Sequence, residues 1–168
     1  ALLPKDTPDY IQTAYQSLYY HAITTVYLRY AQAVKLPAPL TGFSDGTAQW
    51  VLHRGTLGLL DNEVAVVISV SDCTEAWKDK DLAEKIHADI KRVCPDLGKP
   101  KAVRIITEKR ATTAATVDFV QPDFSWLHHR RIYPAGDYLH PRYPATLEAA
   151  VQSGFAAAEK LMLDLRVE

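Results

Sequence analysis

Apolar residues along this chain follow two different periods, and together they predict an α/β or α+β fold. Four stretches rich in β-branched and aromatic residues are typical of strands: 21–30, 49–53, 63–71 and 103–107. Residues 64–68 form a continuous apolar run, which favours a central strand covered on both faces. With a short strand at 131–133, the pattern predicts a mixed sheet of about five strands covered by helices.

Helical spacing of apolar residues begins near the N-terminus. Thr7, Pro8 and Asp9 are typical of a helix start, and we expect Thr7 to cap a short first helix. A second helix begins near Asp81, and Pro95 and Gly98 end it. Its apolar residues recur at i, i+4, i+8 and i+11, which predicts a helix that packs on the sheet: Leu82, Ile86, Ile90 and Val93.

The clearest element is a long amphipathic helix that runs from Ala145 to the C-terminal region. One face carries a wide apolar stripe: Leu147, Ala150, Val151, Gly154, Phe155, Ala158, Leu161, Met162 and Leu165. The other face carries polar residues: Glu148, Gln152, Glu159, Lys160 and Asp164. We interpret the apolar stripe as packing in a core.

Composition places the chain among folded proteins and excludes several classes. It has 168 residues, of which 48% are hydrophobic and 23% charged, so it can build one real core. A formal net charge of -1 argues against a dedicated nucleic-acid binder. No apolar run approaches the roughly 20 residues of a membrane span. The chain starts without Met or a signal-peptide pattern, as if inside a longer chain.

Glycine and the metal-binding residue types are informative by their spacing. The 7 glycines form neither a dinucleotide-binding fingerprint nor a phosphate-binding loop. Cys73 and Cys94 are far apart, so we expect them to be ordinary small apolar residues. His128 and His129 are adjacent and cannot share a face, which argues against a zinc site. The sequence thus predicts no metal site.

The region before the last helix carries the most specific pattern. The segments IYPAGDY (132–138) and YPATLEAAVQSG (143–154) resemble the C-terminal FAD-binding motif of the flavin-containing amine oxidase and phytoene desaturase superfamily. Segments 21–28, 49–55 and 108–112 are similar to one branch, the squalene-associated FAD-dependent desaturases, also called hydroxysqualene dehydroxylases. This resemblance covers most of the chain.

The resemblance implies a cofactor site at this motif. Asp137 would accept a hydrogen bond from the ribityl chain of FAD, and Gly136 would allow a close backbone approach. Ala145, Thr146 and Leu147 would place the N-terminus of the last helix against the flavin ring. Backbone amides and the helix dipole at such an end stabilise negative charge. A simple helix cap is a second interpretation of Thr146, and both can hold together.

The chain departs from the family in one respect. The family binds the ADP half of FAD with an N-terminal dinucleotide-binding fold, and its Gly-rich fingerprint is absent here. We therefore expect a piece of a longer flavoprotein, with a substrate-binding region at 1–125 and the C-terminal FAD-binding motif (strand, Gly-Asp, helix) at 126–168. Its partner would be the N-terminal remainder of the same polypeptide. Alone, the chain is expected to be inactive and to bind FAD weakly or not at all.

The resembled branch implies an FAD-dependent oxidoreductase that acts on an isoprenoid lipid. The reaction would be reductive dehydroxylation of hydroxysqualene to squalene, with a hydride from reduced flavin. The sequence identifies no catalytic residue. Candidate substrate-pocket residues are Trp50, Lys109 and Arg110. Sheet packing is an equal interpretation of Trp50, whereas a charged strand end is the simpler interpretation of Lys109 and Arg110. Trp77 is a weaker candidate for the same apolar pocket.

Two other functions remain open at this stage. One is a different activity of the same superfamily, a flavin amine oxidase or a carotenoid or phytoene desaturase. The other is a non-enzymatic binding module that keeps the fold. In each case no nucleic acid partner is expected. A lipid substrate suits a cytoplasmic protein in peripheral contact with the inner membrane, although no basic amphipathic helix demonstrates that contact.

Overall fold

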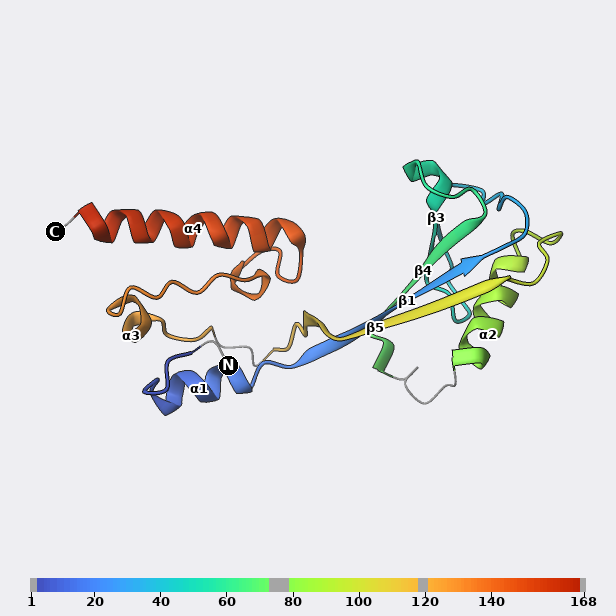
Figure 1. The fold of residues 1–168 in the computed structure, drawn as a ribbon. Helices are drawn as coiled ribbons and strands as arrows, with labels where there is room; N and C mark the ends of the chain where they lie inside the picture. Colours follow the sequence, from blue (N-terminus) through green and yellow to red (C-terminus); the bar gives the residue numbers. More distant parts are fainter. Residues whose placement is uncertain (1–2, 73–78, 118–120, 167–168) are drawn as a thin grey trace. The chain divides into compact units, whose positions relative to one another are not determined.

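The structure, a computed structural model, describes residues 3–72, 79–117 and 121–166 (Figure 1). It divides the chain into two compact units. The sheet unit comprises His21–Ala111, and the helical unit comprises Ala1–Tyr20 together with Thr112–Glu168. The predicted division at residue 125 separates a substrate-binding region from a cofactor motif, and it stays a prediction about function.

The sheet unit contains five strands, the number expected, and their order is β2-β3-β4-β1-β5. Their bounds are β1 (Tyr20–Arg29), β2 (Leu40–Gly42), β3 (Trp50–His53), β4 (Glu63–Ser69) and β5 (Ala102–Thr113). The α/β fold is therefore confirmed. The pairings of β1 with β4, β2 with β3 and β3 with β4 are all antiparallel. The expectation of a mixed sheet needs this correction. Short connections join β2 to β3 and β3 to β4, which allows antiparallel pairing, and β1 also runs antiparallel to β4, with Ile23 opposite Ser69 and Arg29 opposite Glu63.

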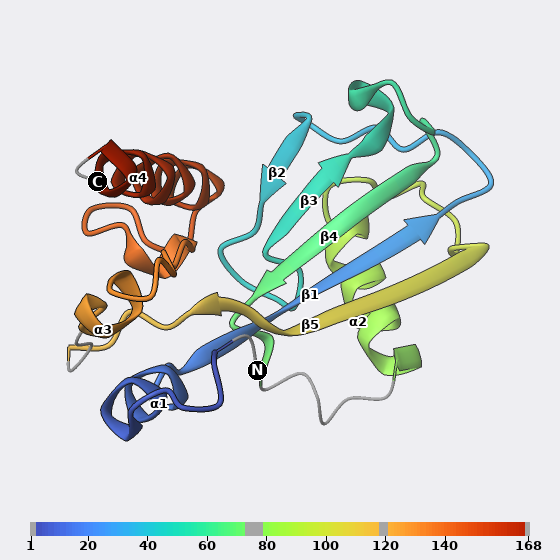
Figure 2. The same ribbon diagram turned by 60° about the vertical axis from the view of Figure 1, so that its left-hand side comes forward.

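Helix α2 (Asp79–Lys91) covers one face of this sheet, as Figure 2 shows. Alternate residues of β1 are buried on that face, among them Val26 and Leu28. On α2, the predicted stripe residues Leu82, Ile86 and Ile90 are buried in the same core. Period-2 and helical patterns thus meet in one hydrophobic layer, as the sequence predicts.

The opposite face of the sheet carries the other alternate residues. Ile23, Thr25 and Tyr27 of β1 are half-buried there, and Trp50 of β3 shares the face because it lies opposite Val67 of β4. Within the sheet unit, no described helix covers this side (Figure 2). We call it the open face.

The helical unit contains α1 (Asp9–Gln16), α3 (Ser125–His128), the short 3-10 helix η3 (Asp137–Leu139) and α4 (Leu147–Arg166). Each α-helix supplies one fully buried residue: Ile11, Leu127 and Ala149. Among the described residues, no helix is both long and apolar enough to cross a membrane. The predicted cap at Thr7 is wrong, since its hydroxyl donates to Pro4 O at 2.7 Å and Pro8 precedes the helix.

One strand prediction is wrong, and one strand is not predicted. Residues 131–133 form no strand: Ile132 N–H donates to Leu127 O at 3.0 Å, and Tyr133 Oη donates to Asp164 Oδ2 at 2.7 Å. The backbone oxygen of Leu127 in α3 and the side chain of Asp164 in α4 therefore accept the hydrogen bonds of this segment, and no described strand pairs with it. The edge strand β2 has no prediction at all, because its three residues lie next to Pro39 and are too few to show a period.

The long helix α4 forms as expected, but its apolar stripe is not packed in a core. Leu147 is 89% exposed and Phe155 67% exposed, and Val151 and Met162 are more than half exposed. The polar face instead contacts the loop before the helix, through Gln152, Ser153 and Asp164. The prediction of an amphipathic helix is confirmed. The prediction that its apolar stripe packs in a core is wrong, because no described element covers the stripe.

Candidate cofactor site

The Gly136-Asp137 segment is held against α4 by hydrogen bonds. Gly136 N–H donates to Ser153 Oγ at 2.9 Å, and Leu139 N–H donates to Gly136 O at 3.1 Å, which closes η3. The Ser153 hydroxyl in turn donates to Ala150 O at 2.8 Å. A short turn thus replaces the predicted strand end and fixes Asp137 near the N-terminal half of α4.

Tyr138 anchors the same turn from the other side. Its hydroxyl donates to Tyr15 Oη at 3.0 Å, and the two rings meet edge to face with centroids 6.0 Å apart. Burial raises the pKa of both phenols, so both stay protonated at neutral pH. A Cβ at residue 136 would lie 2.5 Å from the Tyr138 ring. The observed position of this ring therefore requires glycine at residue 136.

The Asp137 carboxylate is half-buried and has no hydrogen-bond partner in the part of the chain that the structure describes. Its backbone oxygen accepts a hydrogen bond from Ala145 N–H at 3.4 Å, which closes the loop between the turn and α4. Ala145 adopts a left-handed φ of 60°, a conformation that costs a non-glycine residue about 1 kcal/mol. A half-buried carboxylate whose oxygens have no partner among the described residues is suited to accept hydrogen bonds from a ligand.

Thr146 caps α4. Its Oγ1 accepts a hydrogen bond from Ala149 N–H at 3.1 Å and donates to Tyr143 O at 2.8 Å, while Ala150 N–H donates to Thr146 O. The amides of Leu147 and Glu148 have no acceptor among the described residues. These free N–H groups and the helix dipole can bind an electron-rich or anionic ligand atom.

His140 fixes the loop between these two parts. Its Nδ1 accepts hydrogen bonds from Arg142 N–H at 3.2 Å and Tyr143 N–H at 2.9 Å. The ring must therefore carry its proton on Nε2, which donates to Gln152 Oε1 at 2.8 Å. Sequence reasoning missed His140 and Tyr138, because their roles depend on Gln152 and Tyr15, which are distant in sequence.

The structure thus brings the five predicted cofactor residues to one loop and helix end: Gly136, Asp137, Ala145, Thr146 and Leu147. Two hydrogen bonds, from Gly136 to α4 and from Ala145 to Asp137, hold the arrangement. Their role toward a cofactor stays a prediction.

Replacing Thr146 with alanine should destabilise α4 by about 1 kcal/mol, because the cap that accepts the Ala149 N–H is lost. Serine at this position should retain most of the stability, since it keeps the hydroxyl. Urea unfolding followed by far-UV circular dichroism measures the difference. Equal stability of the alanine and serine variants would contradict the capping role.

The predicted substrate residues do not come together in the same way. Trp50 lies on the open face, 49% exposed, and its ring covers Gly42: a Cβ there would meet the Trp50 ring at 2.9 Å. Lys109 and Arg110 are exposed on β5, and β4 and β1 lie between β5 and the strand of Trp50. Trp77 lies outside the described residues.

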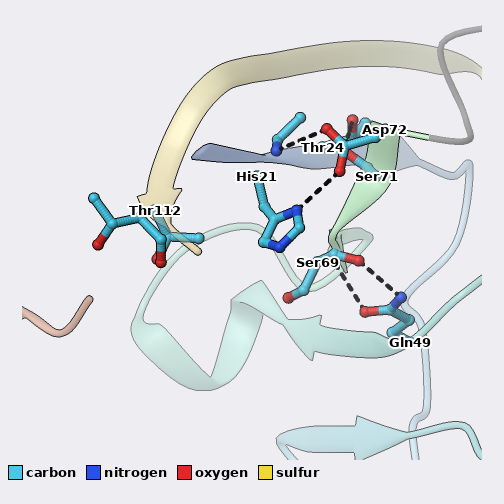
Figure 3. Close-up of polar contacts among 9 residues, drawn as sticks. His21, Thr24, Gln49, Ser69, Ser71, Asp72 and Thr112 are labelled. Carbon is cyan, nitrogen blue, oxygen red and sulfur yellow. Dashed lines mark hydrogen bonds and ion pairs between the residues drawn. The ribbon is translucent and has the colours of Figure 1, made fainter. Parts of the chain in front are cut away.

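A polar cluster lies where β1 begins and β4 ends (Figure 3). His21 Nδ1 is 3.2 Å from Asp72 Oδ2, and Ala22 N–H donates to Asp72 Oδ1 at 3.2 Å. These two hydrogen bonds lower the pKa of Asp72. Ser71 is fully buried and accepts a hydrogen bond from Thr24 Oγ1 at 2.8 Å.

Although serine, histidine and aspartate meet in this cluster, burial keeps the Ser71 hydroxyl from any substrate. Thr24 Oγ1 also lies 2.9 Å from Thr107 Oγ1, so the hydroxyls link β1 to its neighbour β5 and to the segment after β4. The Gln49 side chain similarly bonds both backbone groups of Ser69, at 2.8 and 3.1 Å (Figure 3). We assign the cluster to structure rather than to chemistry.

Metal-binding residues are dispersed in the described part of the chain, where no three of them could hold an ion together. Cys94 is half-buried and donates to Lys35 O at 3.1 Å. Burial raises the pKa of this thiol, as expected for an unreactive cysteine. Cys73 lies outside the described residues.

Comparison with known sequences gives a family match and two relatives. Residues 1–162 match the family model described as "Flavin containing amine oxidoreductase". The chain is 31% identical over 147 residues to a hydroxysqualene dehydroxylase of Rhodopseudomonas palustris, covering 85% of this chain and 33% of that protein. It is 28% identical over 149 residues to a hydroxysqualene dehydroxylase of Zymomonas mobilis, covering 83% and 32%. The chain thus spans about a third of the length of these curated relatives.

The fold also occurs among solved structures. A crystal structure of a protein named for protoporphyrinogen oxidase, from Exiguobacterium sp. 255-15, superposes with a TM-score of 0.56. It covers 91% of this chain and 40% of the other, at 16% identity. At this identity the likeness supports the fold alone.

Proposed function

Because this chain belongs to the flavin-containing amine oxidoreductase family, we propose that the whole protein is an FAD-dependent oxidoreductase that removes the hydroxyl group of hydroxysqualene. The observation that carries the proposal is the half-buried Asp137 carboxylate without a partner, beside an α4 N-terminus that has free amides. The two relatives named as hydroxysqualene dehydroxylases supply the substrate class.

The residues at this site fit FAD by their chemistry. Asp137 offers an anionic acceptor for hydroxyl groups of the ribityl chain, and the Leu147 and Glu148 amides offer donors for an electron-rich ring edge. When bound, the flavin supplies the hydride. The chain's own part is to hold the cofactor through Asp137, orient it at the end of α4, and stabilise negative charge there.

The uncovered stripe of α4 supports a larger protein around this site. Leu147, Val151, Phe155 and Met162 line one side of the helix and are all more than half exposed. Large contiguous apolar surfaces on a folded protein mark interaction sites. We propose that the N-terminal remainder of the polypeptide, which would carry the dinucleotide-binding fold, packs on this stripe and completes the cofactor site.

The open face of the sheet suits an apolar substrate. Trp50, Leu52 and Val67 lie together on it, because Trp50 pairs with Val67 and the next row pairs Leu52 with Ala65.

The proposed reaction breaks the carbon–oxygen bond of the alcohol, delivers a hydride to the carbon and releases the oxygen as water after it takes up a proton. A two-electron donor must then reduce the flavin again.

Single-turnover chemistry with the whole protein tests this proposal. The protein should purify yellow, and after anaerobic reduction its flavin should be reoxidised by hydroxysqualene, with squalene detected by mass spectrometry in equal amount. A primary or secondary amine given to the oxidised protein should cause no bleaching. Bleaching by the amine, with no squalene formed, would instead establish an amine oxidase.

Purified whole protein without any flavin, and unable to take up added FAD, would support the non-enzymatic binding module. That outcome would overturn the cofactor assignment as well as the reaction. Squalene formation at an undiminished rate without flavin would overturn the cofactor assignment alone.

A further inference from the structure

Three exposed leucines lie together on one loop of the sheet unit. Leu57, Leu59 and Leu60 are 66%, 52% and 51% exposed, and Gly58 between them adopts a left-handed φ of 74°. We call residues 57–60 the leucine loop. It follows the 3-10 helix η1 (Arg54–Leu57) and precedes β4, and Figure 1 shows it beyond the end of β3.

The loop is tightly folded rather than extended. Gly58 N–H donates to Gly55 O at 3.0 Å, Leu59 N–H to Arg54 O at 3.2 Å, and Glu63 N–H to Leu60 O at 3.2 Å. Because these bonds satisfy the backbone, the leucine side chains point outward without loss of local structure. A fixed apolar loop of this kind contrasts with ordinary loops, which carry polar residues.

A basic cavity lies at the base of this loop, with a volume of about 460 Å³. Three arginines line it: Arg29, Arg54 and Arg104. Arg54 forms an ion pair with Glu63 and lies 5.1 Å above the ring of Tyr27, so its guanidinium is held in place. Arg29 and Arg104 have no carboxylate partner in the described part of the chain.

The loop and the cavity are parts of one structure. Arg54 and Glu63, which line the cavity, are also the residues whose backbone groups hold the leucine loop at its two ends. Glu63 is the one carboxylate that lines the cavity, and it is already paired with Arg54. Asp61, just after the loop, is exposed. Among the residues that line the cavity, three arginines therefore face one carboxylate.

We propose that the leucine loop and the arginine cavity form a docking site for a membrane surface with anionic phospholipids. The three leucines would enter the interface between headgroups and acyl chains, while Arg29 and Arg104 would bind phosphate groups of the headgroups. A soluble phosphate compound would use the arginines but would leave the leucines in water. Apolar residues and cations side by side match a bilayer surface, where both phases meet.

This inference rests on residues of the sheet unit and holds whatever reaction the protein performs. It also gives the chain a specific membrane contact that needs no spanning helix. A protein docked in this way would have direct access to a substrate dissolved in the bilayer.

Vesicle flotation of the whole protein tests the proposal. Vesicles of phosphatidylcholine alone are compared with vesicles that contain 30% phosphatidylglycerol in the same buffer. Each basic residue near an anionic surface contributes about 1 kcal/mol, which is about fivefold in partitioning. The Arg29→Gln/Arg104→Gln variant should therefore bind anionic vesicles about 30-fold more weakly. The Leu57→Ser/Leu59→Ser/Leu60→Ser variant should lose binding at least tenfold.

Matched controls replace residues of the same kind elsewhere. Lys80→Gln/Lys91→Gln removes two exposed charges from α2, and Tyr10→Ser/Val117→Ser removes two exposed apolar side chains from the helical unit. Both controls should bind like the unchanged protein. Equal loss in the controls, or binding that does not depend on the leucines, would overturn the proposal.

Calorimetry with inorganic diphosphate provides the other arm of the test. The proposal expects no measurable heat at millimolar diphosphate, and flotation only with anionic vesicles. Tight diphosphate binding that Arg104→Gln abolishes, with no flotation of the unchanged protein, would instead assign the cavity to a soluble anion. If the arginine variant floats as well as the unchanged protein, the arginine cavity does not take part in membrane docking and the proposal is wrong on that point.

Discussion

Replacing Asp137 with alanine should strip FAD from the whole protein. Hydrogen bonds to a charged group contribute about 1.5–3 kcal/mol each, so the loss of two at Asp137 should weaken FAD binding by about 100-fold or more. The ratio of flavin absorbance near 450 nm to protein absorbance at 280 nm, measured after gel filtration, reports the bound fraction. The fold should be unaffected, because the carboxylate has no partner among the described residues.

Glu159→Ala is the matched control for this experiment. Glu159 is an exposed carboxylate on α4 with no hydrogen bond to the described residues, so its loss changes charge without touching the turn at Gly136. The Glu159→Ala protein should keep its full complement of FAD. An Asp137→Ala protein that is still fully loaded would show that the cofactor assignment of this residue is wrong.

The strands and helices of the sheet unit could be predicted because their patterns are local. Alternation in β1 and the stripe of Leu82, Ile86 and Ile90 each point to one buried face, and both faces meet in the same core. Edge strand β2 and the turn at 131–133 could not be predicted in the same way. Their conformations depend on partners elsewhere in the chain, for example Asp164 for Tyr133.

The cofactor loop shows the same division. Gly136 and Asp137 are visible as a motif, whereas Tyr138, His140 and Ser153 position them through contacts that no sequence period reveals. For α4, the sequence identifies two faces but not their partners. Its polar face bonds the loop and its apolar stripe stays exposed, which an amphipathic pattern alone does not distinguish.

A second large effect is expected at Asp89 of α2, which lies seven residues after Leu82, beside the apolar stripe of that helix, and is buried in the structure. Its Oδ2 accepts hydrogen bonds from Thr47 N–H at 2.6 Å and Ala48 N–H at 2.9 Å. Asp89→Ala should leave these amides without a partner and destabilise the sheet unit by about 2–4 kcal/mol. The midpoint of chemical unfolding followed by tryptophan fluorescence measures this loss.

Asp89→Asn is the closer comparison, since it keeps one oxygen acceptor and replaces the charged second oxygen with an NH2 group. It should cost less than half as much as alanine, because the amide oxygen can still accept from Thr47 or Ala48. The turn that Asp89 holds leads directly into β3, which carries Trp50. Loss of the carboxylate should therefore also loosen the open face around Trp50 and shift its emission toward longer wavelength.

Gly46 lies against the Asp89 carboxylate, in the turn that this carboxylate holds. It adopts a φ of 98°, and a Cβ there would lie 2.4 Å from Asp89 Oδ1, so Gly46→Ala should destabilise by about 2 kcal/mol or more. In the Asp89→Ala background the clash disappears while the backbone strain remains. The double variant should therefore be at least about 1 kcal/mol more stable than the sum of the single effects predicts. Strict additivity would mean that the carboxylate does not lie against this turn.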